Sequence, residues 1–126
     1  MTQVAEMPAS AAEARDHVHA LMAACPRPFG EVAQTDALLI ISELVTNAQR
    51  HGGGMTGFWA RVTDDHFDVT VEDASPAHPT LPGERPVGSV GGYGWPLVRR
   101  LATSVAVTPT ARGKSIHVAQ RSRSAT

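Results

Sequence analysis

A helical pattern of apolar and polar residues that stops at three successive glycines constrains this chain more than any other feature. We expect a helix from about Glu31 to His51, because its apolar residues return at the spacing that gathers them on one side. That side, which we expect to face the core, consists of Ala37, Leu38, Ile41, Leu44, Val45 and Ala48. We expect Gly52 to cap the helix in a left-handed conformation.

The opposite side of this helix combines an acid, an amide and two basic residues. Glu43 and Asn47 are four residues apart, so a helix stacks them on one side, and Arg50 and His51 follow close to the glycines. A carboxylate and an amide arranged in this way can handle a hydrated cation and a proton together. A solvated polar helix face is the plainer interpretation, and spacing alone favours it.

The other elements predict one α+β domain. Ser10 and Glu13 fit a capping box at the start of a first helix that ends near Ala24. Alternating residues then predict strands over 58–63, 67–72, 104–108 and 115–120, with a helix over 95–102 between the two pairs. We expect a two-layer sandwich in which a mixed sheet carries its helices on one face. The domain would span residues 10–120, after an N-terminal segment, 1–9, that could add an edge strand, and before a flexible tail, 121–126.

Composition excludes several classes of function. A length of 126 residues fits one domain, and a net charge of −1 gives no electrostatic footprint for nucleic acid or an anionic membrane. The single Cys25 cannot form an internal disulfide, which favours a reducing compartment. The sequence has neither an apolar run of roughly 20 residues nor the pattern of a signal peptide. We therefore expect a cytoplasmic protein that contacts neither a membrane nor nucleic acid directly.

A segment rich in proline and glycine, residues 73–94, separates the two pairs of strands. Its last residues, Gly91-Gly92-Tyr93-Gly94, lead into a helix, and free backbone amides at a helix N-terminus favour an anion such as phosphate. A flexible connection with a helix cap is the plainer alternative. Asp73, which opens the segment, can cap its own turn or accept a hydrogen bond from the amino group of a base. For Asp73 taken alone, capping is favoured.

Taken together, these motifs resemble the ATP-binding domain shared by gyrase B, MutL and the sensor histidine kinases. The branch they are most similar to is that of the anti-sigma-factor serine kinases and their small actinobacterial relatives. The matching segments are Glu43-Leu-Val-Thr-Asn47-Ala-Gln-Arg-His51-Gly, Asp73-Ala-Ser-Pro, Gly92-Tyr-Gly94-Trp-Pro-Leu-Val-Arg-Arg-Leu-Ala and Gly113-Lys-Ser115. They arrive in the family's order, and the resemblance as a whole covers roughly Ser10 to Val118, nearly the whole domain.

The resemblance implies a Bergerat-type fold that binds ATP with Mg²⁺. It implies that Asn47 ligates Mg²⁺ and that Glu43 is the general base that activates an attacking hydroxyl. It also implies that Asp73 binds the adenine amino group, with support from Ser115 through water. The other residues implied to bind ATP, by contact with its phosphates, are Arg50, His51, Gly92 and Gly94.

The implied function is that of an ATP-binding regulatory protein. It would be a serine/threonine kinase that acts on an anti-sigma-antagonist-type partner. It would also be an anti-sigma factor that binds a sigma factor, and it would form a homodimer. The alternative is a catalytically weak or inactive binding module of the same fold that sequesters a regulatory partner. Retention of Glu43 favours the kinase. Tyr93 favours the module, because it stands where the family commonly has a basic residue in the glycine-rich loop, or lid, that would close over the nucleotide. A gyrase-type ATPase is less favoured, because no transducer domain follows.

Overall fold

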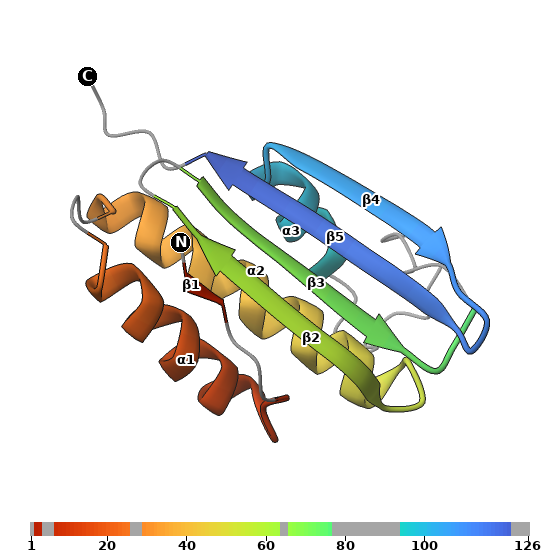
Figure 1. Cartoon of the computed structure of the whole chain (residues 1–126). Coiled ribbons are helices and arrows are strands. Elements are labelled where there is room, and N and C mark those ends of the chain that lie inside the picture. Colours follow the sequence, from red (N-terminus) through yellow and green to blue (C-terminus); the bar gives the residue numbers. More distant parts are fainter. Residues whose placement is uncertain (1, 4–6, 26–28, 64–65, 77–93, 122–126) are drawn as a thin grey trace.

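In the residues that the computed structural model describes, one antiparallel sheet carries three helices against a single face (Figure 1). The structure describes residues 2–3, 7–25, 29–63, 66–76 and 94–121, and the statements below concern these residues. In chain order the elements are β1 (Thr2–Gln3), α1 (Ala11–Ala23), α2 (Glu31–Arg50), β2 (Met55–Val62), β3 (His66–Asp73), α3 (Gly94–Leu101), β4 (Ser104–Pro109) and β5 (Lys114–Arg121). This architecture confirms the predicted α+β sandwich with helices on one side.

The strand order is β1-β2-β3-β5-β4, and each pair of neighbours in the described sheet is antiparallel. The expectation of a mixed sheet is therefore wrong. The hairpin formed by β4 and β5 places β5 beside β3, so β4, which runs in the same direction as β3, never pairs with it. At the other edge β1 pairs with the end of β2, with Thr2 opposite Val62.

The core lies between the sheet and the helices. Successive strand residues point to opposite faces. Most of the residues that β2, β3 and β5 direct towards the helices are apolar and buried, while Asp73, Lys114 and Gln120 are buried polar residues on the same face. The apolar residues are Phe58, Ala60, Val62, Phe67, Val69, Val71, Ile116 and Val118. Helix α2 is central, because it packs against α1, α3 and the sheet. Its buried side consists of Ala37, Ile40, Ile41, Leu44, Val45 and Ala48, so Ile40 belongs to the core and Leu38, half-buried, lies at its margin.

The end of α2 differs in detail from the expectation. His51 is the C-cap, and the amides of Gly52 and Gly54 both donate to the carbonyl of Ala48, at 3.2 and 3.1 Å. The left-handed backbone falls on Gly53 and Gly54, with φ of 71° and 115°, so the prediction for Gly52 is wrong. The chain thus turns one residue later than the sequence suggests.

The start of α1 follows the predicted capping box. The hydroxyl of Ser10 accepts a hydrogen bond from the amide of Glu13 at 3.1 Å, and the Glu13 carboxylate accepts one from the amide of Ala9 at 3.2 Å. The return bond thus reaches one residue before the cap. Across the ranges that the structure covers, no helix combines the length and apolar character needed to cross a bilayer.

Candidate functional site

Three of the motif segments meet at the end of the sheet where β3 stops. The amide of Ala74 donates to the carbonyl of Gly52 at 2.8 Å and to that of Gly54 at 3.2 Å, which joins the turn after α2 to the end of β3. On the other side of β3, Asp73 lies directly opposite Lys114 at the start of β5. Segments separated by up to about 60 residues are thereby brought together around Asp73.

Two glycines allow this close approach. A Cβ on Gly52 would lie 2.6 Å from Cγ and Oδ2 of Asp73, a distance that real Cβ atoms essentially never show. A Cβ on Gly113 would collide with the backbone carbonyl oxygen of Asp73. Gly52 and Gly113 therefore serve packing here, because any larger residue would push the backbone or the carboxylate of Asp73 out of place.

Asp73 and Lys114 form a buried ion pair, with side chains that are 4% and 8% exposed. Nζ of Lys114 lies 2.9 Å from Oδ2 and 3.1 Å from Oδ1 of Asp73, and it also donates to the carbonyl of Ser75 at 3.2 Å. The amide of Ser75 donates to Oδ1 of Asp73 at 2.9 Å. Asp73 thus caps its own turn, as the residue alone suggested. It also pairs with the cation of Lys114, which the sequence motifs did not indicate.

Ser115, which was expected to support Asp73 through water, lies on the other face of the sheet. It pairs with Glu72, and the pair directs its side chains away from the helices, whereas Asp73 and Lys114 point towards them. Alternation along a strand is the reason. The position against Asp73 thus belongs to Lys114. The buried Ile116 and Val118 lie two and four residues after Lys114 in β5 and therefore point to the same face. This alternation is the sequence signal that could have identified Lys114.

Glu43 and Asn47 lie on the side of α2 that is turned away from the core. Both are half-buried, and neither side chain has a hydrogen bond or ion pair in the part of the chain that the structure describes. Arg50 and His51 are exposed at the end of the same helix. One carboxylate and one amide oxygen are thus available close to two basic side chains. Oxygen ligands of this kind suit Mg²⁺, which keeps several waters and needs few protein ligands.

The predicted lid is described in part. Gly92 and Tyr93 lie outside the described residues, and Gly94 is the first residue of α3. Trp95, which follows it, is 5% exposed and packs in the core together with Val98. The large side chain of Trp95 therefore fixes α3 against α2.

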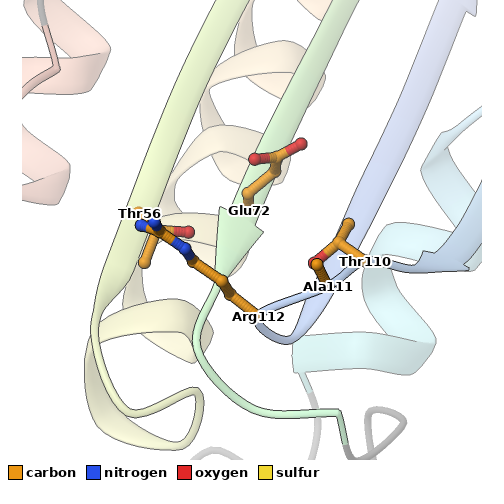
Figure 2. Close-up of a pocket in the computed structure, with 5 residues that line it drawn as sticks. All are labelled: Thr56, Glu72, Thr110, Ala111 and Arg112. Carbon is orange, nitrogen blue, oxygen red and sulfur yellow. The ribbon is translucent and has the colours of Figure 1, made fainter.

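A pocket of about 310 Å³ opens at this end of the sheet, on the face without helices (Figure 2). Its lining residues are Thr56, Glu72, Thr110, Ala111 and Arg112. Figure 2 shows the side chain of Arg112 extending towards Thr56. None of the residues predicted from the sequence lines this pocket, and Glu72 points to the opposite face from Asp73. The pocket is therefore separate from the site around Asp73.

Comparison with known proteins bears on the whole domain. A family model described as the histidine kinase-like ATPase domain matches residues 4–119 of the 126. The match includes α2, Asp73, α3 and the start of β5. No curated protein matches the chain at a significant level.

Proposed function

This chain belongs to the histidine kinase-like ATPase domain family, and on that premise we propose that it is an ATP-dependent serine/threonine kinase that regulates an anti-sigma-antagonist-type partner. The family makes it an ATP-binding domain. The transfer of phosphate to a partner, the binding of a sigma factor and the formation of a homodimer belong to the proposal. The observation that carries it is the convergence of the turn after α2, the end of β3 and the start of β5 around Asp73.

The phosphate end of the proposed site uses α2. Asn47 would ligate Mg²⁺ through its amide oxygen, and Arg50 and His51 would add positive charge beside it. The backbone amides of Gly92 and Gly94 would complete the phosphate contacts. Bound Mg²⁺ would neutralise charge on the phosphates, which together with positioning is most of what phosphoryl transfer requires. The absence of other partners for Asn47 in the described residues fits this role.

Glu43 is the proposed general base. Its carboxylate is half-buried and carries no partner in the described part of the chain, so it is free to accept a proton from the hydroxyl of a partner's serine or threonine. The acceptor residue belongs to the partner in this mechanism, so the chain itself needs no nucleophile. Helix α2 places Glu43 one turn from Asn47, which would bring the proton acceptor close to the bound metal.

A binding module with weak or absent catalysis is the second candidate. The observation that favours it is the state of Asp73, whose carboxylate is already paired with Lys114 instead of waiting for a ligand. Such a module would use the same fold to sequester a regulatory partner.

Phosphate transfer to a recovered partner separates the two candidates. Proteins retained by the full chain from the native host would be incubated with it, Mg²⁺ and ATP labelled in the terminal phosphate. We expect label on a serine or threonine of a retained protein. Glu43→Gln should bind ATP normally and lose transfer by about 100-fold or more, because it removes the base. Glu31→Gln, which makes the same charge change at the exposed start of α2, should transfer normally. Retention of a partner without any transfer would contradict the kinase and support the module.

A further inference from the structure

The end of the proposed site that would hold the purine base contains the carboxylate of Asp73, whose hydrogen bonds are already formed within the chain. An ammonium group has three N–H donors, and Lys114 has three acceptors in reach, namely both carboxylate oxygens of Asp73 and the carbonyl of Ser75. The amide of Ser75 supplies a further donor to Oδ1. Asp73 is therefore neutralised and hydrogen-bonded before any nucleotide is bound.

The surroundings of Asp73 leave little freedom for this arrangement to change. Residue Asp73 is 3% exposed, and the backbone of Gly52 packs so closely on its carboxylate that a Cβ there would be 2.6 Å from Oδ2. The register that sets Lys114 opposite Asp73 is continuous along β3 and β5, from His66 opposite Arg121 onwards. The pairing of β3 with β5 thus fixes the position of Lys114. We therefore treat the pair of Asp73 and Lys114 as a fixed part of the end of the site that would hold the purine.

Discrimination between ligands depends on what happens when the expected contact is missing. A buried acceptor that waits for a ligand's N–H group rejects a ligand without that group, because the acceptor is then left buried and unpaired. This penalty does not arise where the acceptor already has its donors. For Asp73 those donors come from Lys114 and Ser75.

We infer that Lys114 makes nucleotide binding by this chain insensitive to the 6-amino group of the purine, so that a 6-oxo purine nucleoside triphosphate binds about as well as ATP. The inference rests on the proposed function at the same site. It makes Lys114 a specificity-determining residue that acts through Asp73.

The test compares ATP with inosine triphosphate, which differs from ATP in carrying an oxygen in place of the 6-amino group. The dissociation constants of the two for the full chain, each with Mg²⁺, would be measured by titration calorimetry. We expect them to differ by less than about tenfold, whereas a site that depends on the amino group discriminates far more strongly. A preference for ATP of tenfold or more would overturn the inference while leaving the proposed function intact. Failure of both nucleotides to bind would overturn the proposed function, and the inference with it.

Two variants make the test specific to the pair. Lys114→Met keeps the apolar stem but removes the donors, so Asp73 should then depend on the 6-amino group, and the preference for ATP should rise above about tenfold. Arg112→Met removes an exposed cation two residues away, on the face without helices, and should leave the ratio unchanged. An unchanged ratio in a folded Lys114→Met protein would contradict the inference. If that variant does not fold, Asp73→Asn decides: we expect it to change both affinities by the same factor, and a selective loss of ATP would contradict us.

Discussion

Nζ of Lys114 lies 2.9 Å from Oδ2 of Asp73, in a pair whose side chains are both almost fully buried. The pair joins the end of β3 to the start of β5 and reaches Ser75 in the segment beyond. Buried charges are tolerated where they are paired and hydrogen-bonded, and removal of one partner leaves the other uncompensated. The same contact therefore bears on both stability and ligand choice.

Loss of this pair should destabilise the fold. Lys114→Met should lower the free energy of unfolding by about 3–5 kcal/mol, because it leaves the Asp73 carboxylate buried without its cation. Urea denaturation followed by circular dichroism measures the loss. As a control, Arg61→Met removes the cation from the pair with Asp68, in which Arg61 is 51% exposed. That change should cost less than about 1 kcal/mol, and equal losses in the two variants would contradict the structural role of the buried pair.

Gly113 should not tolerate a side chain. Gly113→Ala should destabilise the protein by about 3 kcal/mol or more, because the added Cβ collides with the carbonyl of Asp73 and the backbone around it must move. Gly30→Ala is the matched control, since a Cβ on Gly30 meets nothing within 4 Å. Thermal unfolding of both variants, recorded side by side, should show a large loss for the first and a small one for the second. Equal losses would mean that β3 and β5 do not approach as described.

The start of α2 offers a gain in stability. Gly30 is the N-cap, with φ of −63° and ψ of 158°, and no side chain caps the helix there. Gly30→Ser should raise the free energy of unfolding by about 0.5–1 kcal/mol, because serine can cap the free amides and restricts the unfolded chain. Gly30→Ala, which restricts the chain without a cap, should be less stable than the serine variant. If alanine equals serine in urea denaturation, the capping argument fails.

Local patterns in the sequence predicted the elements well. The helical period from Glu31 onwards and the alternation around Phe58 and Phe67 depend on which side of an element is buried, and that information is local. Strand order depends on contacts between distant segments, and the sequence did not show that β5, rather than β4, lies next to β3.

The site was predicted in part for the same reason. Glu43 and Asn47 share a face because of helical spacing alone, whereas the partner of Asp73 depends on the register between two strands. The family pattern predicted Ser115 as the residue that supports Asp73, although alternation from Ile116 places Lys114 on the inner face. Gly92, which lies outside the described residues, keeps its predicted contact with the phosphates as a proposal.

The binding of ATP with Mg²⁺ tests the central claim most directly, through the melting temperature of the full chain. At an ATP concentration about 100-fold above its dissociation constant, binding adds about 2.7 kcal/mol, so we expect Tm to rise by several degrees. Asn47→Ala should abolish the rise, whereas Thr46→Ala, at the neighbouring half-buried position, should retain it. An unmodified chain whose Tm does not respond to ATP and Mg²⁺, or an Asn47→Ala variant that responds in full, would contradict a nucleotide site on this face of α2.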